Sequence, residues 1–130
     1  MSIFDIFSSR IDRERLSHLK NLVALSMADG KIEKSELLAI AAICNREGVD
    51  EREIDRCIKN PSSIDFCPPS DDNKKIQYLK DMVCLMMCDG NIDNTELAVC
   101  KLTAEALGFK REVIDVMIMD IIEELKKAMQ

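Results

Sequence analysis

Apolar residues recur at helical spacing along most of the chain, and short polar stretches interrupt them. In residues 11–28 the stripe includes Leu16, Leu19, Val23 and Met27, with charged residues between them. Residues three and four positions apart share one face of a helix, so this spacing predicts an amphipathic helix. The same criterion predicts further helices over residues 35–47, 50–58, 72–88, 95–107 and 111–129.

One acidic octet occurs twice, each time between two predicted helices. Asp-Gly-Lys-Ile-Glu-Lys-Ser-Glu fills residues 29–36, and Asp-Gly-Asn-Ile-Asp-Asn-Thr-Glu fills residues 89–96. The offset is 60 residues (89 − 29 = 60), and the ungapped match extends back to His18 and Tyr78. A repeat of this length predicts an internal duplication.

The pattern as a whole predicts one all-α domain over residues 1–130. We expect about seven helices in a pseudo-twofold bundle without a sheet. The repeat halves cover about residues 11–58 and 71–118. Between them, residues 59–73 contain prolines and serines that cannot continue a helix, so they predict a connector. Ile64 and Phe66 are expected to hold this connector against the core.

The two ends of the chain each carry an apolar stretch. Ile3, Phe4, Ile6 and Phe7 predict a short amphipathic helix, which we expect to fold back as a cap on the core. The alternative is contact with a membrane surface or a partner helix. The C-terminal helix, residues 111–129, has an apolar stripe too wide for one neighbour. It is therefore either central to the core or part of an interface, for example in a homodimer.

Composition and charge narrow the classes of function. Hydrophobic residues make up 47% of the chain and charged residues 32%, as in a compact helical protein. The net charge of −6 argues against nucleic-acid binding, which needs a clustered basic face. No apolar run reaches the length of about 20 residues that spans a bilayer, and the first residues do not resemble a signal peptide. We therefore expect a cytoplasmic protein with reduced cysteines.

The acidic octets are the best candidates for chemistry. Asp-Gly-x-Ile-x-x-x-Glu matches the second half of an EF-hand calcium loop, in which a glycine allows the turn that brings two carboxylates together. The first half of that loop is missing, so an ordinary EF-hand is excluded. A calcium ion or another divalent cation would have to collect oxygens from several acids of both turns: Asp29, Glu36, Asp89 and Glu96, with help from Glu33 and Asp93.

A purely structural role explains the same acids equally simply. Asp93 and Glu96 have the spacing of a helix N-cap and its third residue, and Asp29 or Asp89 could cap the helix that follows. On the residues alone, capping is favoured over metal binding. Both interpretations stay open at this point.

The duplicated octet between apolar helices resembles the TerB-like family, which includes the tellurite-resistance protein TerB and a domain of membrane-associated J-domain co-chaperones. The segments that carry the resemblance are Met-Ala-Asp-Gly-Lys-Ile at residues 27–32 and Met-Cys-Asp-Gly-Asn-Ile at residues 87–92. The resemblance spans about residues 10–127. It implies an all-helical pseudo-twofold fold, calcium or another divalent cation at the acidic turns, and a stress-response role in protein complexes near the bacterial inner membrane.

The same resemblance implies Asp29, Glu36, Asp89 and Glu96 as ligands. No J-domain is present, so co-chaperone recruitment is not implied. Lys31 places positive charge beside the first turn, so we expect the second turn to bind a cation better.

Two further hypotheses follow from the residues. The chain could be a protein-interaction adaptor whose acidic turns are structural, or a thiol-based detoxifier of tellurite or metals that uses Cys84, Cys88 and Cys100. Core packing is the favoured interpretation of these cysteines. His18, the single histidine, lies on the polar edge of its predicted helix, so we expect it at or near the surface. Because no nucleophile motif accompanies it, we do not expect an enzyme.

Overall fold

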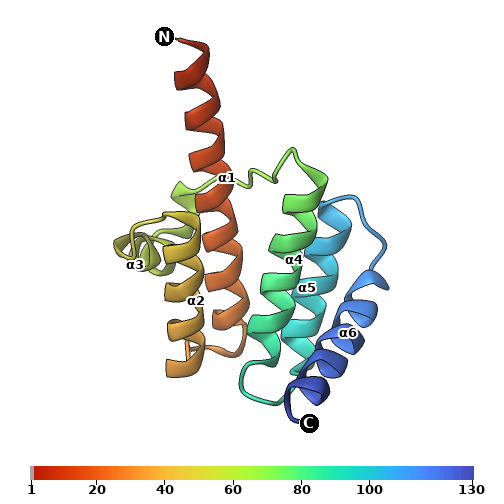
Figure 1. The fold of residues 1–130 in the computed structure, drawn as a ribbon. Coiled ribbons are helices and arrows are strands. Elements are labelled where there is room, and N and C mark those ends of the chain that lie inside the picture. The colour runs from red at the N-terminus through yellow and green to blue at the C-terminus, as the bar shows by residue number, and fades with distance from the viewer. Residues whose placement is uncertain (1) are drawn as a thin grey trace.

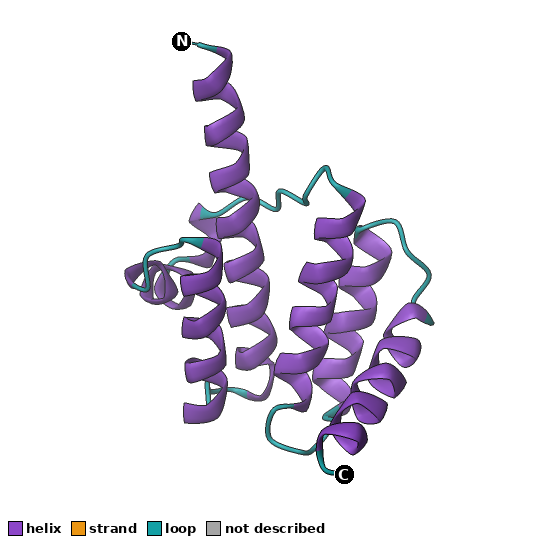
Figure 2. Ribbon diagram, in the orientation of Figure 1, coloured by secondary structure: helices purple, strands orange, loops and turns teal. Residues whose placement is uncertain are grey.

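The chain forms helices and no strand in the part that the structure describes (Figure 1, Figure 2). This computed structural model describes residues 2–130, apart from the side chains of Phe4, Asp5, Phe7, Ser8 and Asp29. The predicted all-α fold class is confirmed. In chain order, the α-helices and the two short 3-10 helices (η) are α1 (Ile3–Ser26), η1 (Met27–Asp29), α2 (Lys34–Glu47), α3 (Arg52–Lys59), η2 (Pro61–Ser63), α4 (Asp72–Met87), α5 (Asn94–Ala106) and α6 (Val113–Ala128).

Helix α1 is the central element of the bundle. It contacts α2, α3, α4 and α5, whereas α6 packs against α4 and α5 on the side away from α3 (Figure 1). All six α-helices contribute buried apolar side chains to one core cluster. Its fully buried members include Leu22, Leu25, Ile40, Leu79, Met82 and Ile114.

The two octets form the same kind of turn. Gly30 has φ +107° and Gly90 has φ +85°, and both values lie in the left-handed region that favours glycine. Their N–H groups donate to the carbonyl oxygens of Met27 at 2.9 Å and Met87 at 3.0 Å, so each glycine closes the preceding helical turn. The chain then enters the next helix after three further residues.

The N-terminal segment differs from the prediction. The structure has six α-helices in its described residues instead of about seven, because the segment expected as a separate cap is the beginning of α1. No glycine or proline interrupts residues 1–29, so nothing ends the helix there. Ile3 is 71% exposed and Ile6 is 54% exposed, and Figure 1 shows this end extending beyond the bundle. Phe4 and Phe7 were also predicted to belong to this cap, but their side chains are not among those that the structure describes.

The connector between the halves is held against α1 through its backbone. Lys20 Nζ donates to the carbonyl oxygen of Ile64 at 2.5 Å, and Ser17 Oγ accepts the N–H of Cys67 at 2.8 Å. One turn earlier, Glu14 Oε1 accepts the N–H of residue 70 at 2.9 Å. The expectation for Ile64 is confirmed, because it is buried, but Phe66 is 48% exposed and does not belong to the core.

Helix α6 lies at the edge of the bundle. Ile114 and Ile121 are buried against α4 and α5, but Val116, Met119 and Leu125 are each more than half exposed. The sequence left open whether this helix is central or at an interface, and the structure excludes the central position. None of the described helices has the length and apolar character needed to span a membrane.

Candidate functional site

The two acidic turns lie at the same end of the bundle, opposite the N-terminus (Figure 1). Helix α5 contacts η1 of the first turn, and Cys88 Sγ, beside the second turn, lies 4.0 Å from Ser35 Oγ at the start of α2. Burial and then the negative charges of Glu36, Asp89 and Glu96 raise the pKa of the Cys88 thiol. Acids of both octets therefore lie within electrostatic reach of one another.

The acids that begin the second helix of each hairpin are used in capping. Glu36 is buried, and its Oε1 accepts the N–H of Glu33, the N-cap residue of α2, at 3.0 Å. Asp93 is the N-cap residue of α5, and its Oδ1 accepts the N–H groups of Thr95 at 2.8 Å and Glu96 at 3.1 Å. The capping interpretation of Asp93 is thus confirmed. Glu36 also acts in capping, because its bond to the Glu33 N–H stabilises the start of α2.

The acids that open each octet are placed differently. Asp89 is exposed, and its Oδ1 accepts the N–H of Asn91 at 3.0 Å, so it stabilises the turn and does not cap α5. The side chain of Asp29 lies outside the described residues. Glu96 is buried at the start of α5, as Glu36 is at the start of α2. Among the described side chains, no group of three or more His, Cys, Asp or Glu residues is placed to hold a metal ion.

A second polar cluster joins α1, α2 and α4. We call it the cross-helix network; its members are His18, Arg46, Glu47, Lys74, Tyr78 and Asp81. Arg46 donates to Asp81 through both terminal nitrogens, at 2.9 and 2.5 Å. The Tyr78 hydroxyl donates to Glu47 Oε1 at 2.5 Å, and Lys74 Nζ lies 3.2 Å from Glu47 Oε2. Two carboxylates thereby connect helices of the first half of the chain with α4 of the second half.

His18 lies at the centre of the cross-helix network. Its ring stacks on the Tyr78 ring with centroids 3.7 Å apart and planes 1° apart, and its Nε2 lies 2.8 Å from Asp81 Oδ2. Because a carboxylate only accepts hydrogen bonds, Nε2 carries the proton. Burial lowers the pKa of His18 below 6.5, and the hydrogen bond and charge of Asp81 only partly oppose that shift. The neutral imidazole is therefore the stable form in the folded protein.

The two carboxylates of the cross-helix network are held in their charged form. Burial alone would raise the pKa of Glu47, but hydrogen bonds from Tyr78 and Lys74 outweigh it and lower that pKa. For Asp81, burial is likewise outweighed by hydrogen bonds from Arg46 and His18, so its pKa is also lowered. Both groups therefore need their partners to remain ionised in the fold.

Sequence reasoning missed this network. His18 was expected at or near the surface, but it is only 3% exposed. One signal was available: Glu47 is the last residue of α2, directly before Gly48, where a negative charge faces the negative end of the helix dipole. An acid at that position is favourable only if donors from other elements reach it. The identity of those donors was not readable from the pattern.

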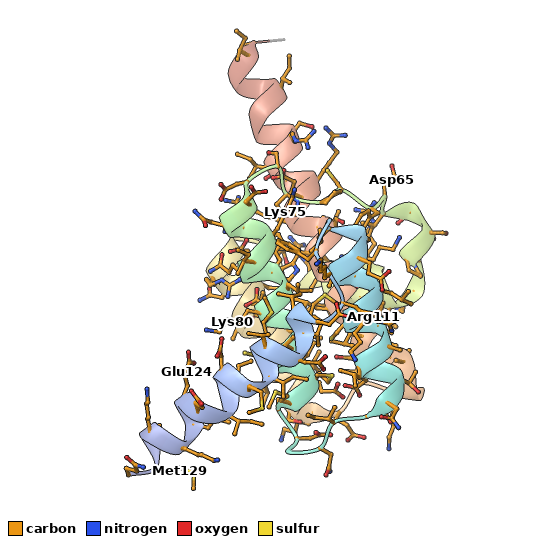
Figure 3. All side chains as sticks on the ribbon, turned by 90° about the vertical axis from the view of Figure 1, so that its right-hand side faces the viewer. Asp65, Lys75, Lys80, Arg111, Glu124 and Met129 are labelled. Atoms are coloured by element: carbon orange, nitrogen blue, oxygen red, sulfur yellow. The ribbon has the colours of Figure 1, made fainter. Side chains whose placement is uncertain are left out.

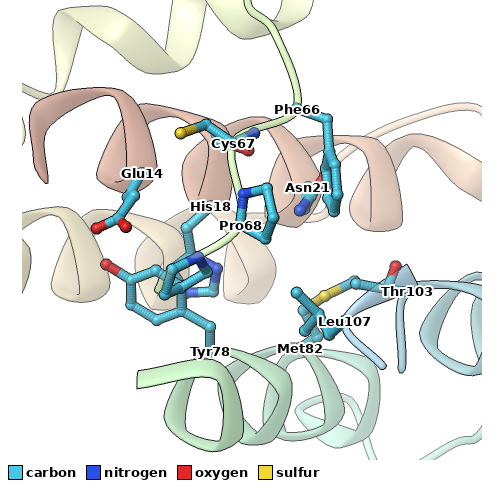
Figure 4. A pocket seen from close by; sticks show the side chains of 12 residues that line it. Glu14, His18, Asn21, Phe66, Cys67, Pro68, Tyr78, Met82, Thr103 and Leu107 are labelled. Atoms are coloured by element: carbon cyan, nitrogen blue, oxygen red, sulfur yellow. Dashed lines mark hydrogen bonds between the residues drawn. The ribbon is translucent and has the colours of Figure 1, made fainter. Parts of the chain in front are cut away.

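The space beside the cross-helix network is too small for a ligand. Figure 4 shows His18, Tyr78, Glu14 and Met82 around a cavity of about 10 Å³, which has room for about one water molecule. Pro68 of the connector lies beside it. The network therefore joins helices and encloses no substrate-sized site.

The three cysteines of the second half do not have the properties of reactive thiols. Cys100 is buried, as the core interpretation predicts, but Cys84 and Cys88 are exposed, so that interpretation is wrong for these two. Their first-half counterparts are Ala24, which is exposed, and Ala28, which is half-buried. Neighbouring atoms desolvate Cys84 and Cys88 in part and Cys100 more fully, which raises the pKa of all three thiols, that of Cys100 to about 12. A reactive thiolate needs the opposite shift.

A groove of about 470 Å³ lies between α4 and α6. Apolar side chains form part of its lining, and Lys80 Nζ of α4 lies 3.5 Å from Glu124 Oε1 of α6 at its edge (Figure 3). We call it the α4–α6 groove. Its lining residues are Ile76, Lys80, Val113, Val116, Met117, Asp120, Glu123, Glu124 and Lys127.

Comparison with protein-family models, curated proteins and solved structures finds no match to the chain. The resemblance to the TerB-like family therefore rests on the repeated octets and the helical pattern around them.

Proposed function

We propose that the protein is a non-enzymatic protein-interaction module that binds a partner helix in the α4–α6 groove. The observation that carries this proposal is the groove itself, which is much larger than the cavity beside the cross-helix network and has an exposed apolar residue, Val116, in its lining. An amphipathic helix in an apolar groove is a common mode of protein recognition. Lys80 and Lys127 also line the groove, and Lys80 pairs with Glu124. Asp120 and Glu123 form no ion pair among the described residues, and these two acids favour a helix that carries a basic residue beside its apolar ones.

Photo-cross-linking in cells tests this proposal. A photoreactive side chain at position 116 should form specific cross-linked species, whereas the same group at position 102 should not. Leu102 is a matched control because it is 65% exposed on α5, compared with 58% for Val116 on α6. The substitution Glu123→Lys should reduce the cross-links from position 116. Equal products from both positions would contradict a partner site in the groove.

A second candidate function is cation binding at the acidic turns. One observation favours it: Glu36, Asp89 and Glu96 all raise the pKa of the Cys88 thiol, so acids of both turns lie within electrostatic reach of the same side chain. Each carboxylate has two oxygens, and the bonds described for Glu36 and Asp89 use one oxygen of each. Calcium or another divalent cation could bind to the remaining oxygens together with Asp29, Glu33 and Asp93.

Calorimetric titration with calcium separates the two candidates. Cation binding predicts heat release and a higher melting temperature in calcium, both lost in Asp89→Ala and kept in Asp65→Ala. Asp65 is a suitable control because it is an exposed acid of the connector. An absence of heat and of any thermal shift in the parent protein would leave the acidic turns with their structural role.

The other expectations from sequence also stay proposals. A TerB-like module in bacterial stress response would act with protein partners in the cytoplasm, near the inner membrane, and its halves would be related by a pseudo-twofold axis. Burial agrees with that relation at several positions 60 residues apart, including Leu19 with Leu79 and Glu36 with Glu96. The thiol hypothesis has the least support, because the pKa of each candidate thiol is raised.

A further inference from the structure

The first half of α1 is an amphipathic helix that extends away from the bundle. We call residues 3–13 the N-terminal arm; in Figure 1 it continues α1 beyond the other helices. Ile3, Ile6 and Ile11 are 71%, 54% and 43% exposed. A helical segment of about ten residues is marginally stable in water without packing, and grouped exposed apolar residues mark contact surfaces. The arm therefore has the character of a segment that binds another surface.

The N-terminal arm and the α4–α6 groove have complementary chemistry. Ile3, Ile6 and Arg13 lie three and seven positions apart, which places them on one side of the helix. On the groove side, Val116 is apolar, Asp120 and Glu123 are acidic, and the lining also includes Lys80 and Lys127. Arg13, Asp120 and Glu123 form no ion pair within the part of the chain that the structure describes. Both surfaces thus expose apolar residues, and the unpaired cation of the arm is opposite in charge to two unpaired acids of the groove.

The arm cannot reach the groove of its own chain. Helix α1 is continuous from Ile3 to Ser26, so the direction of the arm is fixed by the packed half of the helix. Figure 1 shows the arm leaving the bundle at the N-terminal end, while α6 lies at the edge of the bundle beside α4 and α5 and runs to the opposite end. Any arm that occupies the groove must therefore come from a second molecule.

We propose that two copies of the chain form a closed dimer in which the N-terminal arm of each lies in the α4–α6 groove of the other. Ile3 and Ile6 pack against the apolar lining, and Arg13 pairs with Asp120 or Glu123 at the rim. The reciprocal exchange covers both arms and leaves no open end for further growth. This inference rests on the proposed function, since it names the chain's own arm as the helix that the groove binds.

Complementation between two variants tests this arrangement. Ile3→Asp with Ile6→Asp disables the arm, and Val116→Asp disables the groove. Sedimentation equilibrium should give a dimer of 29.4 kDa for the parent (2 × 14.7 kDa) and monomers for each variant alone. A mixture should again contain dimers, because the intact arm of the groove variant fits the intact groove of the arm variant. All substituted side chains are more than half exposed, so the variants should fold like the parent, and circular dichroism checks this.

Each alternative arrangement gives a different result in the same experiment. If arms pair with arms, the groove variant dimerises alone; if α6 pairs with α6, the arm variant dimerises alone. Either result overturns the proposal, and so does a parent that stays monomeric at every concentration or a mixture that stays monomeric.

A charge exchange provides a second test. Arg13→Glu and Glu123→Arg should each weaken dimerisation on the order of fivefold, and the combined variant should recover most of the affinity. Lys110→Glu is a control for the change in net charge, since Lys110 is exposed outside both surfaces, and it should leave the dimer unchanged. Failure of the combined variant to recover would overturn the pairing of Arg13 with the groove rim.

The outcome is distinguishable from failure of the proposed function. If the parent is monomeric but position 116 still cross-links specifically to a different protein, the groove binds a partner helix and the arm is not that helix. If position 116 cross-links to nothing and the parent is monomeric, both proposals fail together.

Discussion

The acids of the repeated octets and the acids of the cross-helix network have different structural roles. Asp93 and Glu36 accept N–H groups within three residues of themselves, so each stabilises the start of its own helix. Besides a bond from the adjacent Arg46 to Glu47, Glu47 and Asp81 accept bonds from side chains 27 to 63 positions away and connect α1, α2 and α4. The repeated motif therefore organises local structure, and non-repeated residues hold the helices together.

The largest expected effect is at Glu47. Glu47→Ala removes the acceptor of Tyr78, Lys74 and Arg46, so we expect a loss of about 2–3 kcal/mol in the free energy of unfolding. Urea denaturation measures it, with exposed Asp65→Ala as the control. A loss below about 1 kcal/mol would mean that the network contributes no more than a helix cap.

The next effect is a pH dependence caused by His18 in the cross-helix network. The pKa of His18 is below 6.5 in the fold, so the unfolded chain takes up a proton first as the pH falls. The contribution of His18 to stability should be fully present well above pH 6.5, the pKa of the unfolded chain, and should decrease as the pH falls through 6.5 towards about 5. His18→Gln should be less stable at pH 7 but should lose this slope. Stability of the parent that is constant or rises over the same range would contradict the assignment of a neutral His18.

A smaller effect is expected at the cap of α5. Asp93→Ala leaves two N–H groups without their acceptor and should cost about 1 kcal/mol. Glu33→Ala at the equivalent position of the first octet should cost less, because glutamate is a poorer N-cap residue than aspartate. Thermal unfolding of both variants checks the order. Equal losses would show that the two octets are more alike energetically than their cap residues indicate.

The smallest effect is expected at Ser26, whose hydroxyl group takes part neither in local capping nor in bonds between helices. Its Oγ is buried and has no hydrogen-bond partner within the described residues. Ser26→Ala should therefore raise the free energy of unfolding by about 0.5 kcal/mol. Ser17 is a matched control, since it is equally buried but accepts the N–H of Cys67. Ser17→Ala should lower stability, and a loss of stability in both variants would contradict the role given to Ser26.

The local features of the fold were readable from the sequence. Helix periodicity and the glycines of the octets predicted the hairpins, and the Asp93 cap followed from residue spacing. These features depend on neighbours within about one helical turn, which a sequence displays directly. The continuous α1 was missed because the pattern of Ile3 and Ile6 does not say whether a helix folds back or extends.

The tertiary features were not readable in the same way. His18 and Asp81 are 63 positions apart, and no periodicity reveals that they meet. The repeat offered one indirect indication, because His18 and Tyr78 occupy equivalent positions and stack on each other. The match between the halves does not say which equivalent positions meet, and the packed structure identifies His18 and Tyr78 as such a pair.

The way in which α1 holds the connector has a consequence for how this chain can vary. Glu14 and Ser17 accept backbone N–H groups of the connector and Lys20 donates to a backbone carbonyl oxygen. The carbonyl is present in every residue, and the N–H in every residue except proline. Substitutions along residues 65–70 can therefore accumulate with little loss of attachment. An inserted or deleted residue would move every backbone group out of register with the three side chains. The connector is thus freer in its composition than in its length.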